Sequence, residues 1–155
     1  LPGARWVDPA NCHVTLRFIG DIDERTAHEI ASALAGIRRR PVEVAVRELS
    51  SFGGRKPRAV VASVAPDPAL MDLQAEIERQ VRRAGIEPEG RKFTPHVTLA
   101  RLRDATSRDV ANYLAARGYF PAQTFTAPRF VLFSSRASVG GGPYVVEDAY
   151  ALAPA

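Results

Sequence analysis

His13-Val14-Thr15-Leu16 and His96-Val97-Thr98-Leu99 are two copies of one tetrapeptide, His-x-Thr-x in pattern, and they decide how the rest of the chain is interpreted. Each copy opens a stretch of alternating polar and apolar residues, which is typical of a half-buried strand. Side chains two apart on a strand point the same way, so each histidine shares a face with its threonine. The same alternation places Arg17 on the face of the first histidine. The repeat predicts two related lobes, each presenting one imidazole and one hydroxyl.

Outward from the two motifs, hydrophobic periodicity predicts the remaining strands and helices. Strands are expected at residues 12–20, 41–49, 59–64, 96–102, 129–134 and 144–152, and helices at 23–34, 67–84 and about 106–116. Residues 50–57 are expected to form a connection, and residues 140–143 a turn. Several predicted strands follow one another without a helix between them. This order favours an α+β fold with mainly antiparallel sheets.

Length and composition fit one globular domain that spans residues 1–155. The chain is 46% hydrophobic and 25% charged, which allows a core without disulfides or a structural metal. No apolar stretch approaches the roughly 18 residues of a membrane span, and the first residues lack a signal-peptide pattern. The single cysteine, Cys12, has core-facing parity and is expected to be a small buried hydrophobe rather than a nucleophile. A lone cysteine fits a reducing compartment, so we expect a cytoplasmic protein.

The basic residues are almost all arginines. Lysine and arginine total 21 against 17 acidic residues, a formal charge of +4, and the lysines are Lys56 and Lys92. Arginine binds phosphate oxygens bidentately, which suits an anionic ligand. The many alanines are consistent with a second explanation, a bias in genome composition. The charge therefore permits an anionic ligand without indicating a long nucleic-acid track.

Two imidazoles facing one phosphate carry a specific chemistry. Histidine exchanges protons near neutral pH, so a pair can act as base and acid in a displacement, each transfer contributing roughly 10²–10⁴-fold. Threonine hydroxyls can donate to phosphate oxygens. The alternatives are structural histidines, threonines present only as strand formers, and a zinc site. The last is disfavoured because no His-x-x-x-His or Cys-x-x-Cys pair occurs, so no metal is expected.

Together with Trp6-Val7-Asp8-Pro9, Arg91-Lys92-Phe93-Thr94-Pro95 and Phe133-Ser134-Ser135-Arg136, the two motifs resemble the two-histidine phosphoesterases. Within them, the chain is similar to the bacterial and archaeal RNA 2′,3′-cyclic phosphodiesterases, also called the 2′-5′ RNA ligase family. The resemblance covers nearly the whole chain, including the glycine turn and Tyr144. It implies a bilobal α+β fold with pseudo-twofold symmetry, two mainly antiparallel sheets facing across a central cleft, and helices outside. Family members usually open with a further strand and helix, which we do not expect in the residues ahead of Trp6.

The resemblance also implies an activity: hydrolysis of a 2′,3′-cyclic phosphate on RNA ends or small nucleotides to a 2′-phosphomonoester, without metal or cofactor. Reversible 2′-5′ ligation is a variant of it. By resemblance, His96 is the base that activates water, His13 is the acid, and Thr15 and Thr98 hold phosphate oxygens. Arg101 matches an arginine that the family uses on the phosphate. Strict alternation would point Arg101 away from His96, so this placement needs a bulge or a twist of the strand.

A second class of function stays open: a non-catalytic module that binds phosphorylated RNA ends or nucleotides. The basic pI of about 9.7 motivates it. Phe52 and Phe93 are expected in loops, where they either stack a base or pack at the loop ends. His28 and the run 38–40 are expected to be solvated. We expect a monomer with no membrane partner.

Overall fold

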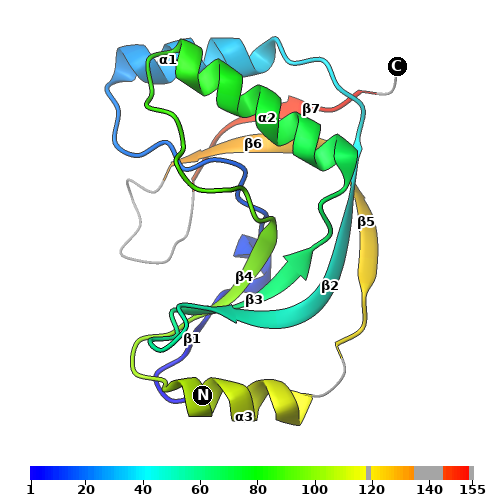
Figure 1. The fold of residues 1–155 in the computed structure, drawn as a ribbon. Helices are drawn as coiled ribbons and strands as arrows, with labels where there is room; N and C mark the ends of the chain where they lie inside the picture. The colour runs from blue at the N-terminus through cyan, green and yellow to red at the C-terminus, as the bar shows by residue number, and fades with distance from the viewer. Residues whose placement is uncertain (118–119, 135–144, 154–155) are drawn as a thin grey trace. The chain divides into compact units, whose positions relative to one another are not determined.

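The computed structural model describes residues 1–117, 120–134 and 145–153. Their strands form two antiparallel sheets, one of five strands in the order β1-β4-β3-β2-β5 and one of two, β6-β7 (Figure 1). In chain order the elements are β1 (Arg5–Trp6), a 3-10 turn (Pro9–Asn11), α1 (Glu24–Ala35), β2 (Val42–Phe52), β3 (Ala59–Val64), α2 (Pro68–Arg83), β4 (His96–Arg101), α3 (Ser107–Arg117), β5 (Gln123–Ala127), β6 (Arg129–Ser134) and β7 (Val145–Ala151). The predicted α+β class with antiparallel sheets is confirmed.

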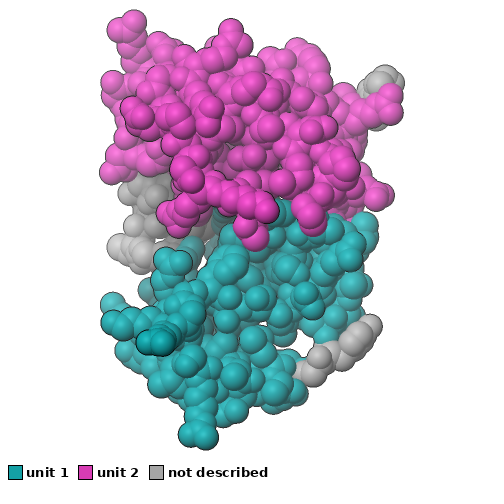
Figure 2. All heavy atoms as spheres, in the orientation of Figure 1, with its two compact units in different colours: residues 1–15, 45–65, 95–124 teal, residues 16–44, 66–94, 125–155 magenta. Residues whose placement is uncertain are grey.

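The chain divides into two compact units, and each draws on three separated segments (Figure 2). Unit 1 consists of Leu1–Thr15, Ala45–Ala65 and Pro95–Thr124. Unit 2 consists of Leu16–Val44, Pro66–Thr94 and Phe125–Ala155.

Unit 1 is built around β3, whose side chains are buried on both faces. This is why its sequence is a continuous apolar run rather than an alternating one. Val60 and Val61 are each 1% exposed, although they point to opposite faces. The helix α3 contributes the buried Val110 and packs Tyr113 against Trp6 of β1, with ring centroids 5.7 Å apart.

Unit 2 packs α1 and α2 together and α1 against β7 (Figure 1). Asp23 caps α1 by accepting a hydrogen bond from the Thr26 backbone N–H at 2.8 Å, and Asp67 caps α2 in the same way. Gly85, with φ of +100°, follows the end of α2. Helical spacing predicts a buried stripe of Ile30, Ala31 and Leu34 on α1 and of Leu70, Leu73, Ile77 and Val81 on α2. All of these are buried except Ala31, which is half-buried.

Several element boundaries differ from the sequence prediction. The strand expected at 12–20 is reduced to a single bridge at Val14. β2 continues to Phe52, so the expected connection at 50–57 shrinks to the turn that starts at Gly53. The short β1 and the polar β5 were not predicted, because two residues or an exposed stretch give no usable periodicity. The turn expected at 140–143 lies outside the described residues.

Within the described residues, no helix has both the length and the apolar character that crossing a bilayer requires.

Candidate active site

The two tetrapeptide motifs lie on neighbouring backbone segments of unit 1. Val14 forms an antiparallel bridge to Val97. When the register is continued by one residue on each side, His13 stands opposite Thr98 and Thr15 stands opposite His96. Alternation puts these four side chains on one face. Each histidine is therefore a direct cross-strand neighbour of the other motif's threonine.

The repeat predicted one histidine in each of two lobes, but both motifs belong to unit 1. The physical reason is that an alternating strand pattern identifies which face a residue occupies and not which strand lies beside it. Two similar strands can sit in separate sheets or pair with each other. Here they meet through Val14 and Val97, which brings the two motifs together within one unit.

His13 is half-buried, and a short turn orients its ring. Its Nδ1 lies 2.8 Å from the backbone oxygen of Asn11. A carbonyl oxygen only accepts, so Nδ1 donates its hydrogen, and the neutral imidazole has its lone pair on Nε2. Asn11 ends the 3-10 turn, which Asp8 caps by accepting from the Ala10 backbone N–H at 2.9 Å. The capped turn thus selects the tautomer of His13.

His96 is the first residue of β4 and pairs with Ser63 of β3. The ring of Phe52 meets the imidazole edge-on, with centroids 4.7 Å apart and an interplanar angle of 86°. Just before it, the buried Pro95 accepts a hydrogen bond from the Val64 backbone N–H at 3.1 Å. His96 is therefore held by strand pairing on one side and by an aromatic ring on another.

Phe52 is a site residue that the sequence left as a loop position. It is the last residue of β2, and its carbonyl accepts from the Arg58 backbone N–H at 2.7 Å. Gly53 follows with φ of +110°, and a Cβ there would lie 2.3 Å from the Lys56 carbonyl oxygen. Only glycine fits this turn without displacement. The tight turn is what fixes Phe52 in the strand beside β3.

Arg101 reaches the face of Thr98 through a register shift. Val61 pairs with Thr98, but Val60 pairs with Ala100, so β4 has one extra residue at Leu99. This irregularity reverses the alternation, and Arg101, opposite Ala59, returns to the face that carries Thr98. The bulge that Arg101 needed in order to share a face with His96 is present.

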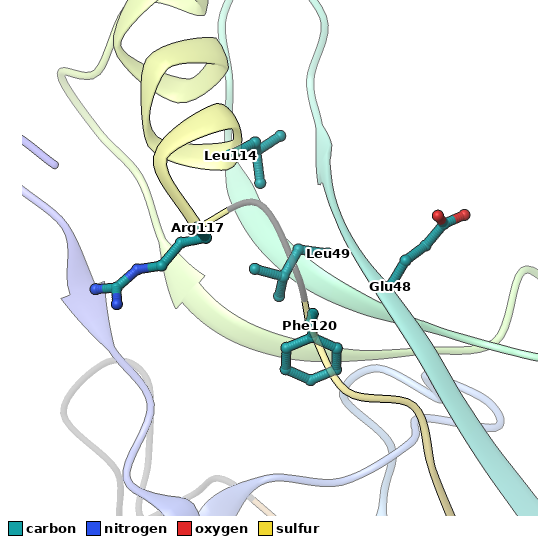
Figure 3. A pocket seen from close by; sticks show the side chains of 5 residues that line it. All are labelled: Glu48, Leu49, Leu114, Arg117 and Phe120. Atoms are coloured by element: carbon teal, nitrogen blue, oxygen red, sulfur yellow. The ribbon is translucent and has the colours of Figure 1, made fainter.

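The other face of this sheet is occupied by packing. Leu49, Ala62 and Val97 share it by register, and Leu49 lines a cavity of about 120 Å³ beneath α3. Figure 3 shows Leu49 grouped with Leu114 and Phe120, while Glu48 and Arg117 extend to opposite sides. The cavity contains no motif residue, and it faces away from the histidines.

Arg17 does not join His13 on the motif face, contrary to the alternation pattern. It belongs to unit 2, where its guanidinium binds the Glu78 carboxylate with Nε 3.0 Å from both oxygens and Nη2 2.8 Å from one. It also donates to the carbonyls of Phe18 and Glu87. The chain stops pairing as a strand after Val14, so alternation no longer governs where Arg17 points.

Cys12 is half-buried, next to His13 in sequence. Burial raises the pKa of its thiol, and the nearby Asp8 carboxylate raises it further by a smaller amount. A thiol with a raised pKa is a poor nucleophile, consistent with the expected packing role. In the described part of the chain, no three histidine, cysteine or acidic residues gather as a metal site would require.

Comparison with known proteins identifies close relatives. A model of the 2′-5′ RNA ligase superfamily matches residues 4–138. An RNA 2′,3′-cyclic phosphodiesterase of Aeropyrum pernix is 40% identical over 103 residues, which make up 65% of this chain and only 58% of that relative. A protein of the same name from Aquifex aeolicus is 30% identical over 152 residues, 94% of this chain and 81% of the relative. The crystal structure of E. coli LigT complexed with 3′-AMP has a similar fold, with a TM-score of 0.74 and 23% identity over 97% of this chain and 82% of that one.

Proposed function

The chain belongs to the 2′-5′ RNA ligase superfamily, and on this premise we propose that it hydrolyses 2′,3′-cyclic phosphodiester ends of RNA or nucleotides to 2′-phosphomonoesters. The observation that carries the proposal is the bridge between Val14 and Val97, which sets the two His-x-Thr motifs crosswise on one face. The names of the relatives supply the substrate class, and the crosswise motifs supply the chemistry.

The register supports joint action of the two imidazoles. His13 stands opposite Thr98, so His96 is its diagonal neighbour, and the Cβ atoms of diagonal neighbours lie roughly 7 Å apart. A phosphate between the two rings would be within hydrogen-bond reach of both. Thr15 and Thr98 occupy the other diagonal, where their hydroxyls would donate to the non-bridging oxygens.

In the proposed reaction, His96 accepts a proton from water as the water oxygen forms a bond to phosphorus. The bond between phosphorus and the 3′-oxygen breaks, and His13 donates a proton from Nε2 to that oxygen. The hydrogen bond from His13 Nδ1 to the Asn11 carbonyl supports this role, because it holds Nε2 as the exchanging atom. Arg101, on the same face through the bulge, would neutralise charge that develops on the phosphate.

Hydrolysis of 2′,3′-cyclic mononucleotides in the presence of a chelator tests the proposal. His13→Ala and His96→Ala should each lower kcat by about 10²–10⁴-fold. His28→Ala is the matched control, because His28 is exposed on α1 in unit 2. Unchanged turnover in either motif variant, or a requirement for added metal, would contradict the mechanism.

The alternative is a module that binds phosphorylated RNA ends or nucleotides without turning them over. The excess of arginine motivates it, but relatives named as phosphodiesterases do not favour it. Stable binding with no product after long incubation would select this function. Ligation is distinguished by joined product from cyclic-phosphate and 5′-hydroxyl ends. We further propose that the protein is cytoplasmic, because a lone cysteine, Cys12, fits a reducing compartment. We also propose that it is a monomer, which size-exclusion chromatography would test.

A further inference from the structure

Six cationic side chains gather at one end of the unit 1 sheet. Arg5 and Arg101 face each other across the β1–β4 pair, three more lie in the β2–β3 turn, and the last follows β4. All six are exposed. We call this set the basic edge: Arg5, Arg55, Lys56, Arg58, Arg101 and Arg103.

Backbone hydrogen bonds hold the basic edge together. Arg101 pairs with Arg5 on one side and with Ala59 on the other. The Leu102 backbone N–H donates to the Arg58 carbonyl at 2.8 Å, which joins the end of β4 to the β2–β3 turn. In Figure 1 this turn lies at the same end of the sheet as the end of β4. Arg5, Arg58 and Arg101 are therefore fixed on a hydrogen-bonded framework, and the other three flank it in the sequence.

The charge arrangement is unfavourable for the fold alone. Like charges directly opposite on antiparallel strands destabilise the pair, and Arg5 and Arg101 stand in that relation. Across the described residues, no member of the basic edge forms an ion pair with a carboxylate. Asp104 is the neighbouring acid, and it lies against Gly3. The surplus positive charge suits an external anion.

The basic edge is continuous with the proposed active site. The bulge at Leu99 returns Arg101, and with it Arg5, to the face of Thr98. Arg101 is therefore the member of the basic edge nearest the histidines, where it would contact the reacting phosphate. The β2–β3 turn is joined to the end of β4 beyond Arg101, so its three cations would meet the phosphate of the neighbouring nucleotide.

We propose that the basic edge binds the sugar–phosphate backbone of an RNA strand whose cyclic end lies at His13 and His96, so that the preferred substrate is an oligonucleotide rather than a mononucleotide. This inference rests on the proposed function. Guanidinium groups bind phosphate bidentately, and exposed phosphate contacts position a nucleic acid without reading its sequence. The expected recognition is therefore insensitive to base identity.

Charge removal in the β2–β3 turn provides the kinetic test. The measured quantity is kcat/KM for an oligonucleotide 2′,3′-cyclic phosphate divided by kcat/KM for a cyclic mononucleotide. The triple variant Arg55→Ala, Lys56→Ala, Arg58→Ala should lower this ratio by about tenfold. The control Arg40→Ala, Arg79→Ala, Arg83→Ala removes three exposed charges from unit 2 and should leave this ratio unchanged. The charge-retaining variant Arg55→Lys, Arg58→Lys, with Lys56 unchanged, should keep most of the ratio.

A binding experiment tests the inference independently of the proposed function. Its probe is RNA that ends in a 2′-phosphate, and fluorescence anisotropy measures the affinity. In a plot of log affinity against log salt concentration, the slope should become shallower by about 2 in the triple variant. Each lost contact with a phosphate of single-stranded RNA removes about 0.7 from this slope, and the variant loses three contacts. Edge-dependent binding without hydrolysis of any substrate would support the inference and overturn the proposed function. If both substrates are hydrolysed, and the edge and control triple variants change the ratio of kcat/KM values equally, the inference is overturned and the proposed function stands.

Discussion

Val14 and Val97 face each other across a single antiparallel bridge, and that bridge sets the order of the four polar side chains around them. His13 and Thr98 form one cross-strand pair, and Thr15 and His96 form the other. The two imidazoles therefore lie on one diagonal and the two hydroxyls on the other. Such an arrangement would surround one small tetrahedral anion with alternating partners, as the proposed function requires.

The pH dependence of hydrolysis should be bell-shaped. Catalysis needs one imidazole neutral, to accept a proton from water, and the other protonated, to donate to the 3′-oxygen. Activity should therefore fall at low pH, where the base is protonated, and at high pH, where the acid has lost its proton. The measurement is kcat/KM on a cyclic mononucleotide from pH 5 to pH 9, and a monotonic curve with chemistry rate-limiting would argue against the pair.

Arg101 should contribute to catalysis, whereas Arg103, two residues further along the chain, should not affect hydrolysis of a cyclic mononucleotide. The bulge places Arg101 on the motif face, and Arg103 lies past the end of β4. Arg101→Gln should lower kcat/KM by about 10²–10³-fold, the usual effect of removing a donor to a developing charge. Arg103→Gln is the matched control. Equal small effects from both substitutions would mean that the bulge does not aim Arg101 at the phosphate.

The Arg17–Glu78 pair should make unit 2 sensitive to acid. Hydrogen bonds from Arg17 lower the pKa of Glu78, so the folded state holds this proton more weakly than the unfolded state does. The stabilisation is complete above the ordinary glutamate pKa of about 4.3 and is lost as pH falls through the lowered folded value.

Glu78→Gln should therefore lower the free energy of unfolding by about 2 kcal/mol at pH 7. Below about pH 4, the difference in unfolding free energy between this variant and the natural chain should shrink. Urea unfolding at both pH values measures this. Glu29→Gln is the control, because Glu29 and Arg25 form an exposed pair with a 3.6 Å separation that should contribute little. A Glu78→Gln deficit that is constant with pH would show that the carboxylate charge is not the source.

Gly53 and Gly54 offer a matched pair of backbone substitutions. Both have positive φ, but a Cβ on Gly53 would collide with the Lys56 carbonyl, whereas a Cβ on Gly54 would meet open space. Gly54→Ala should cost about 1 kcal/mol and Gly53→Ala clearly more, in thermal or urea unfolding. Because Gly53 follows Phe52, the second variant should also reduce kcat. Equal stability of the two variants would show that the turn relaxes freely.

Periodicity predicted the elements of unit 2 well, because α1 and α2 have caps and an apolar stripe that depend only on local sequence. It also identified β3, and the choice of Arg101 required a bulge that the structure contains. The pairing of the motifs with each other was not predictable, since register depends on partners distant in the chain. Arg17 and Phe52 were misplaced for the same reason: Glu78 and His96 are their partners, and no local pattern reveals them.

Because unit 1 is assembled from three stretches of the chain, its synthesis has a definite order. The first motif is made before both helices of unit 2, and its partner strand β4 is made after them. A nascent or truncated chain that ends before His96 therefore holds the His13 imidazole without its His96 counterpart. The pair of motif imidazoles is complete only after β4 has been made.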